Sequence, residues 1–291
     1  MKFIERAHID TVIWDAKIAQ SNIENIFCYS WYLDACAKNW GAIISDDYNT
    51  IVPIAYNNKL GVKQMYQAQF TREIDIFGNE FNWKEALEFL SKDFKAIQFR
   101  NSNKEILDDN DERKNQWLSL REELKFSTNA KRLIKKADKQ FDYRSEKDPK
   151  QLLDLFKSTA FQKIDSINED DLQRLENLMK SAIKLGHGDL ISVYENNEFV
   201  GAGFFLLDKK RVTYLKSASS EKAKKEGAMY GLINHAITKF KADYETLDFG
   251  GSDVESVANF YKKFGSSDRS YYNYTINNLP LWFKTLKRIK G

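Results

Sequence analysis

The sequence is poor in the residues that form cross-links, sharp turns and metal sites. Of its 291 residues, 2 are cysteine, 3 proline, 13 glycine and 3 histidine. The low proline and glycine content excludes collagen-like and low-complexity chains. Cys28 and Cys36 lie eight residues apart, which suits reduced, buried thiols better than a disulfide. The histidines do not cluster with them, so we expect no metal site.

Long hydrophobic runs and a large net charge are also absent. No apolar stretch approaches the roughly 18 residues of a membrane-spanning helix, and residues 1–6 lack the apolar core of a signal peptide. The 45 basic and 42 acidic residues nearly balance, which excludes a dedicated nucleic-acid coat protein. We therefore expect a cytoplasmic protein without stable membrane insertion, on which any basic site is local.

Hydrophobic residues make up 42% of the chain and aromatic residues 14%, enough for a packed core. The length is about twice that of a usual single domain and predicts two domains. Apolar periodicity predicts an α+β protein with mixed sheets. The predicted helices span about 9–20, 30–39, 83–93, 128–140, 149–160, 168–185, 227–241 and 254–264; the predicted strands span about 43–44, 50–56, 63–66, 190–194, 199–206, 211–216, 246–249 and 270–276.

The two halves follow a similar order of elements. Asn57-Asn58 and Asn196-Asn197 are predicted hairpin turns 139 residues apart, and Gln98-Phe99 precedes Asp248-Phe249 by 150. These similar offsets favour an internal duplication. The polar stretch 140–149 is the predicted boundary, because Asp148-Pro149 suits the start of a helix. We expect domains at 1–142 and 143–291.

The segment Lys224–Ile233 follows a strand and opens a helix. A glycine there lets main-chain N–H groups approach an anion, to which the helix dipole adds. This segment resembles the pyrophosphate loop of the GNAT N-acyltransferases, although Met229 replaces a small residue and predicts weaker coenzyme A binding. The alternative is a glycine that only starts a helix. The resemblance implies an acyl-donor site at Lys216, Ser217, Ala218, Ser219, Lys224, Gly227, Ala228 and Met229.

The segment Val257–Gly265 resembles the last helix of the same family. In that family a tyrosine, here Tyr261, lies beside the donor's leaving atom and returns a proton to it. The alternative is that Tyr261 is only part of the apolar stripe of an amphipathic helix, together with Phe260 and Phe264.

Two further passages resemble the Fem-type peptidyltransferases, which are tandem GNAT-like proteins: Leu247–Ser252, and Gln116–Leu120 followed by Ser127–Ala137. This resemblance covers nearly the whole chain and implies two GNAT-like domains with an interdomain cleft. The N-terminal domain has no glycine loop and is expected to be non-catalytic, so the donor site is expected in the C-terminal domain. Asp248 would orient or deprotonate the acceptor amine, or it only caps the next turn.

The resemblance implies an N-acyltransferase or aminoacyltransferase that acts on an amine of an envelope or glycan precursor, with an acyl coenzyme A or an aminoacyl-tRNA as donor. The alternative is a catalytically silent module that binds a nucleotide-linked ligand. Residues Leu281–Arg288 are amphipathic and basic, which suits an anionic membrane or packing against a domain. A run of basic residues either binds a phosphate group or forms a solvated helix face: Lys131, Arg132, Lys135, Lys136 and Lys139.

Overall fold

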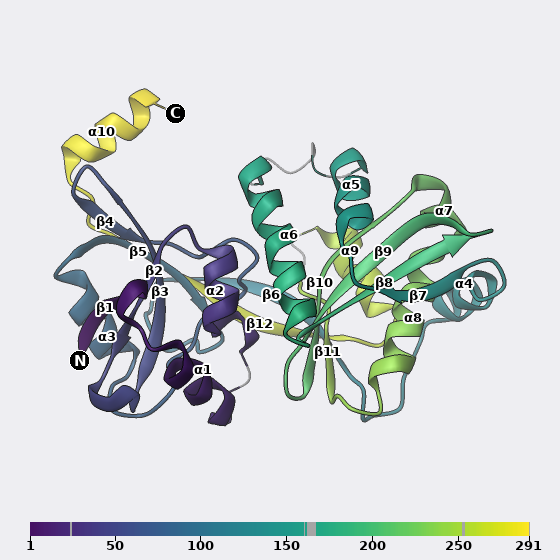
Figure 1. Cartoon of the computed structure of the whole chain (residues 1–291), viewed down its shortest axis with the longest axis horizontal. Helices are drawn as coiled ribbons and strands as arrows, with labels where there is room; N and C mark the ends of the chain where they lie inside the picture. Colours follow the sequence, from purple (N-terminus) through teal and green to yellow (C-terminus); the bar gives the residue numbers. More distant parts are fainter. Residues whose placement is uncertain (24, 160, 162–166, 252–253, 291) are drawn as a thin grey trace. The chain divides into compact units, whose positions relative to one another are not determined.

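The computed structural model describes residues 1–23, 25–159, 161, 167–251 and 254–290, the last five of these as backbone only. The chain forms two compact units. The first comprises residues 1–113 and 270–291, and the second comprises residues 114–269. Each unit combines a mixed sheet with helices, as Figure 1 shows, which confirms the predicted α+β fold.

The first unit has the strand order β1-β2-β3-β4-β5-β12. Its strands β4 and β5 are parallel, and its other neighbouring strands are antiparallel. The elements are β1 (Lys2–Glu5), α1 (Thr11–Gln20), α2 (Ser30–Cys36), β2 (Trp40–Ile44), β3 (Ile51–Lys59), β4 (Val62–Met65), α3 (Trp83–Ser91), β5 (Phe94–Asn101), β12 (Ser267–Asn277) and α10 (Leu281–Lys290), with short 3-10 turns at Arg6–His8, Ile26–Cys28 and Asp46–Tyr48.

The second unit has the strand order β7-β8-β9-β10-β11-β6. Here β10 and β11 are the parallel pair. The elements are β6 (Asn110–Ser119), α4 (Thr128–Ala137), β7 (Asp142–Glu146), α5 (Lys150–Thr159), α6 (Glu169–Lys184), β8 (Gly188–Glu195), β9 (Glu198–Leu207), β10 (Arg211–Ser219), α7 (Glu221–Glu226), α8 (Ala228–Phe240), β11 (Thr246–Asp248) and α9 (Glu255–Lys262). From β7 to β11 the strand order and directions repeat those from β1 to β5.

Each unit includes one strand that comes from the other half of the sequence. Strand β6 follows β5 along the chain but pairs with β11, where Leu118 lies opposite Leu247. Strand β12 follows β11 but pairs with β5, where Tyr274 lies opposite Phe99. The boundary expected at 142/143 therefore falls within the second unit and inside β7, which pairs with β8.

One of the two predicted asparagine turns is wrong. Asn57 and Asn58 lie in β3, and the turn to β4 is at Leu60 and Gly61, with φ of 52° and 78°. The turn at Asn196-Asn197 is confirmed, with φ of 51° and 66°. The first pair belongs to the β3–β4 hairpin and the second to the β8–β9 hairpin, so the two are not equivalent. The repeated topology therefore supports the duplication, but the asparagine spacing does not.

Helices cover both faces of the second unit's sheet. On one face, Phe205 belongs to a buried cluster with residues of α4, α8 and α9. Its neighbour Phe204 points the other way, because a Cβ on Gly188 would lie within 3 Å of both Phe204 and Ala182 of α6. Helix α8 packs closely against β7 at Gly231, where a Cβ would lie 1.7 Å from the hydroxyl of Tyr143 in β7.

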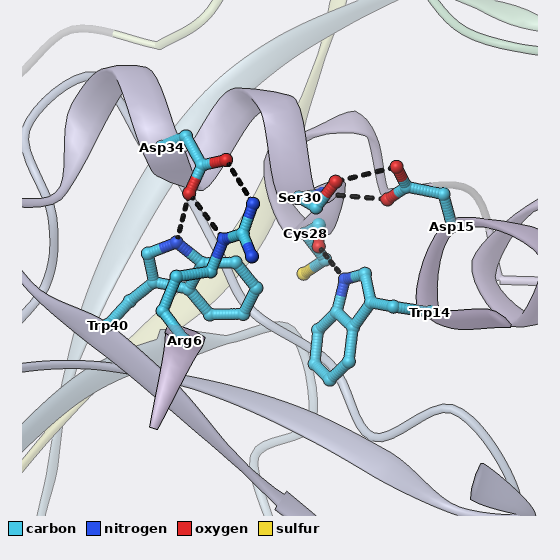
Figure 2. A network of polar contacts seen from close by, with 7 residues as sticks. All are labelled: Arg6, Trp14, Asp15, Cys28, Ser30, Asp34 and Trp40. Carbon is cyan, nitrogen blue, oxygen red and sulfur yellow. Dashed lines mark hydrogen bonds and ion pairs between the residues drawn. The ribbon is translucent and has the colours of Figure 1, made fainter. Parts of the chain in front are cut away.

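A network of polar contacts links the first elements of the first unit (Figure 2). Asp34 of α2 accepts hydrogen bonds from the Arg6 guanidinium at 2.7 and 2.8 Å and from Trp40 Nε1 at 2.7 Å. Asp15 of α1 accepts from the main-chain N–H and the hydroxyl of Ser30. Burial raises the pKa of Asp15, although both bonds from Ser30 oppose the rise. These bonds fix α1 and α2 against the strands.

The two cysteines lie next to this network. Trp14 Nε1 donates a hydrogen bond to the carbonyl oxygen of Cys28 at 2.9 Å (Figure 2). Cys28 and Cys36 are both buried, and neither forms a disulfide, as the sequence predicts.

Candidate functional site

The candidate site lies in the second unit, where β10 and β11 separate. The two strands are neighbours over three residue pairs, the last of which joins Thr213 to Asp248. Strand β11 ends there, whereas β10 continues to Ser219, with a register shift against β9 between Tyr214 and Lys216. In the described part of the chain, β10 beyond Thr213 therefore has no strand partner on the β11 side. Its main-chain groups on that side are available to a ligand.

The donor-site residues predicted on the strand lie on this separated part of β10. Ala218 is buried, and Ser217 and Ser219 are half-buried. The Lys216 ammonium lies 3.4 Å from the centroid of the Phe156 ring of α5. Burial lowers the pKa of Lys216 to about 8. This amine can therefore release and rebind a proton near neutral pH.

Tyr261 of α9 packs beside the point of separation. Its ring stacks on Phe249 with centroids 4.6 Å apart and meets the Tyr214 ring edge-on at 6.3 Å. Only 9% of Tyr261 is exposed. Burial, with the neighbouring Tyr261 phenol as a second cause, raises the pKa of Tyr214 far above its ordinary value. Tyr214 therefore stays protonated at neutral pH. The structure thus places Tyr261 in the core beside the separated strands, and its role as an acid stays a prediction.

Asp248 is fully buried at the end of β11, with 1% exposed. Its Oδ1 accepts hydrogen bonds from the Gly250 N–H at 2.8 Å and from Asn115 Nδ2 at 3.2 Å. Among the described residues, neither Asp248 Oδ2 nor Asn115 Oδ1 has a hydrogen-bond donor. Asp248 thus caps the following turn with one oxygen and can accept a proton or hydrogen bond with the other. Asn115, which the sequence does not single out, positions this carboxylate.

The turn after Asp248 requires glycine. Gly250 and Gly251 have φ of 81° and 67°, in the left-handed region. A Cβ on Gly251 would lie 2.7 Å from the Asn115 Cβ. The turn therefore brings the main chain against β6 and holds Asn115 next to Asp248. Ser252, the last residue of the Leu247–Ser252 segment, lies outside the described residues.

The predicted pyrophosphate loop is a corner between two helices. Residues 221–226 form α7, and Gly227 both ends α7 and starts α8 with φ of 93°. A Cβ on Gly227 would lie 3.3 Å from the carbonyl oxygen of Leu133 in α4. Glu226 forms an ion pair with Lys136 of α4, whereas the Lys224 side chain is exposed. The glycine thus allows a close contact between α4 and the corner.

The first residues of α8 face the protein interior. Ala228 is fully buried, and Met229 is half-buried against the hydrophobic core. The next residue, Tyr230, packs edge-on against Phe260 with centroids 4.9 Å apart. Because Phe260 precedes Tyr261, the start of α8 and the candidate acid belong to the same part of the unit. The structure therefore brings the predicted site segments into one region.

A groove of about 360 Å³ lies between α4 and α8. The exposed residues Lys131, Lys135 and Lys139 lie along it, and among the described residues these three side chains form no hydrogen bond or ion pair. The groove is lined by Phe126, Lys131, Ile134, Lys135, Asp138, Lys139 and Asn234. It therefore presents free ammonium groups beside an apolar floor. In the described residues, no group of three His, Cys, Asp or Glu side chains could hold a metal ion.

Comparison with protein families identifies the class of the second unit. Residues 125–263 match the family model of the acetyltransferase (GNAT) domain. The matched segment is similar to this domain and contains the separated β10 and β11. No curated protein sequence matches the chain.

The fold of the whole chain is Fem-like, with two tandem GNAT-like units. The crystal structure of FemX is 13% identical, covers 98% of this chain and 99% of its own, and has a TM-score of 0.72. A tandem GNAT protein from the clavulanic acid biosynthesis pathway is 9% identical over 96% and 99%, with a TM-score of 0.55. The C-terminal domain of a protein described as a lysylphosphatidylglycerol synthetase from Agrobacterium fabrum is 12% identical over 91% and 90%, with a TM-score of 0.63.

Proposed function

We propose that this protein transfers an activated acyl or aminoacyl group to an amine on a cell-envelope or glycan precursor in the cytoplasm. The observation that carries the proposal is the separation of β10 and β11 in a GNAT domain, with Asp248 at the end of one strand and Tyr261 beside it. The names of FemX and of a lysylphosphatidylglycerol synthetase among the similar structures support an envelope-related acceptor.

The proposed reaction uses three groups of the second unit. Asp248 Oδ2 accepts a proton from the acceptor amine as its nitrogen attacks the donor carbonyl. Main-chain N–H groups of β10 beyond Thr213 stabilise the oxyanion that forms. When the carbon–sulfur or carbon–oxygen bond breaks, Tyr261 gives its proton to the leaving atom, and solvent reprotonates the tyrosine. The result is an amide, the free thiol or alcohol of the donor, and a proton carried away from Asp248.

Two donor classes fit this reaction, and the structure offers an observation for each. The GNAT domain supports an acyl coenzyme A bound at Lys216–Ser219 and at Lys224, Gly227, Ala228 and Met229. The contact of the Gly227 corner with α4 and the lysines of the α4 groove favour an aminoacyl-tRNA, whose phosphates those lysines would neutralise. A nucleotide-linked ligand bound without turnover is the expected result if the protein is a silent binding module.

A thermal shift screen distinguishes these donors, because a ligand that binds the folded state raises the melting temperature. The ligands are acetyl coenzyme A, longer acyl coenzymes, charged tRNA and nucleotide sugars. If tRNA stabilises the protein, the substitutions Lys131→Glu, Lys135→Glu and Lys139→Glu together should abolish that shift. The matched control reverses three exposed lysines of the first unit: Lys84, Lys92 and Lys104. Stabilisation by none of the ligands would contradict the proposal.

A further inference from the structure

Helix α10 of the first unit begins with two exposed apolar residues. It starts after Pro280, whose carbonyl oxygen accepts a hydrogen bond from the Phe283 N–H at 3.0 Å. Leu281 is 82% exposed and Trp282 is 51% exposed, whereas Phe283 is 3% exposed. Figure 1 shows this helix as the last element of the chain. One aromatic side chain is therefore buried, and the two apolar residues before it face solvent.

The same segment is strongly basic. Residues 270–291 contain no Asp or Glu, whereas acidic and basic residues nearly balance over the whole chain. The basic residues of the segment all lie in α10: Lys284, Lys287, Arg288 and Lys290. An exposed Leu-Trp pair beside this charge needs a partner that offers apolar and anionic groups together.

We propose that α10 binds the surface of a membrane that contains anionic phospholipid. Trp and Leu side chains insert at the boundary between headgroups and acyl chains, and lysine and arginine bind the phosphates. At about 1.5 Å per residue, α10 is roughly 15 Å long, about half the thickness of the hydrocarbon core, so it would lie in the membrane plane. None of the described helices is long and apolar enough to cross a membrane.

A second exposed apolar pair shows why charge decides which apolar surface is assigned to membrane binding. Val12 and Ile13 of α1 are 79% and 46% exposed, comparable to Leu281 and Trp282. Asp10 and Asp15 flank this pair, so an anionic surface would repel it. The α1 pair is therefore a matched control for apolar exposure without basic charge.

The test measures co-sedimentation of the full chain with vesicles of phosphatidylcholine alone and of phosphatidylcholine mixed with phosphatidylglycerol. We expect binding to the mixed vesicles only, weakened by salt. Replacing both Leu281 and Trp282 with Ser, or both Lys284 and Lys287 with Glu, should each lower the partition coefficient about tenfold or more. Circular dichroism checks that the variants fold.

Three results would overturn the proposal. The first is a wild-type chain that does not bind the mixed vesicles. The second is an equal loss of binding when Val12 and Ile13 are replaced with Ser, or when Lys131 and Lys135 are replaced with Glu. The third is a concentration-dependent dimer, seen by light scattering without vesicle binding, that the Leu281 and Trp282 substitutions disrupt; a second copy of the chain would then cover this surface.

Discussion

Removing the hydroxyl of Tyr261 tests the catalytic role of this residue separately from its role in packing. The ring is held between Phe249 and Tyr214, so Tyr261→Phe keeps these contacts and removes only the proposed acid. If donor and acceptor are supplied, we expect kcat to fall roughly 10²-fold to 10⁴-fold with little change in melting temperature. The control Tyr244→Phe removes another partly buried phenol of the same unit and should leave kcat unchanged. Equal rates for the Tyr261 variant and the wild type would assign Tyr261 to the core alone.

A substitution of Asp248 can likewise distinguish its role as a catalytic base from its role as a cap of the following turn. In Asp248→Asn the amide oxygen can still accept from Gly250 and Asn115, but the side chain can no longer take a proton. We expect a folded variant, within about 1 kcal/mol of the wild type, whose kcat falls by about 10² or more. Urea unfolding and steady-state kinetics measure the two quantities. A large loss of stability with an unchanged rate would show that Asp248 only holds the turn.

Lys216 should make stability depend on pH in the alkaline range. Its pKa falls from 10.5 to about 8 on folding, so the unfolded chain binds more protons between these values. The stability of the wild type should therefore rise as the pH increases through this window. The side chain at position 216 cannot titrate in the Lys216→Met variant. The free energy of unfolding of this variant, measured in urea, should therefore exceed that of the wild type most below pH 8, and the difference should shrink toward pH 10.5. An advantage that is the same at both ends of the window would contradict the lowered pKa.

Among the elements, most of the longer helices and several buried strands were predictable from apolar periodicity, whereas β5 and β6 were not predicted as strands. The predicted helix at 227–241 is observed as α8, Ala228–Phe240, and the predicted strand at 246–249 as β11, Thr246–Asp248. Strand β7 was predicted as a linker because it lies at the edge of the sheet and reads Asp-Tyr-Arg-Ser-Glu, with little apolar signal. Helix α7 was missed because its six residues, mostly charged, carry no apolar stripe.

The candidate site was predictable only in part. Motif resemblance singled out Asp248 and Tyr261, because each lies in a local pattern of strand, turn or helix. Asn115 bonds to Asp248 across 133 residues of sequence. Only the pairing of β6 with β11 brings the two together, and no local pattern encodes that pairing. The hairpin turn was predicted at Asn57-Asn58 because asparagine tolerates positive φ, whereas the turn forms at Leu60-Gly61, where both residues have positive φ.

The crossing of α8 over β7 depends on the absence of a side chain at Gly231. A Cβ there would lie 1.7 Å from the Tyr143 hydroxyl, so Gly231→Ala should destabilise the fold by about 1–3 kcal/mol despite the better helix propensity of alanine. The Tyr143 hydroxyl is buried and has no hydrogen-bond partner among the described residues. Tyr143→Phe should therefore cost little and restore part of the loss in the double variant, because the added Cβ would still lie 2.7 Å from the Tyr143 ring and 2.8 Å from the Ala137 Cβ. Additive losses in urea unfolding would contradict this contact.

At the scale of the whole molecule, the exchanged strands determine where the chain can be cut. A fragment of residues 114–269 contains β6 and the strands from β7 to β11, so it should unfold cooperatively in a thermal melt. A fragment of residues 143–291 lacks both β6 and β5, the partner strands of β11 and β12. It should be aggregated or unfolded, because β11 and β12 then each have an unpaired edge. Cooperative folding of the second fragment would contradict the unit boundaries.

The exchange of strands also sets an order of events during synthesis of the chain. The second unit is continuous in sequence and can fold as soon as residue 269 has left the ribosome. The first unit was started earlier but is completed later, because β5 pairs with β12, which is made near the end. During that interval the edge of β5, which includes Phe99, is not yet paired with β12. The unit that is started first is thus the unit whose strand edge stays exposed longest during synthesis.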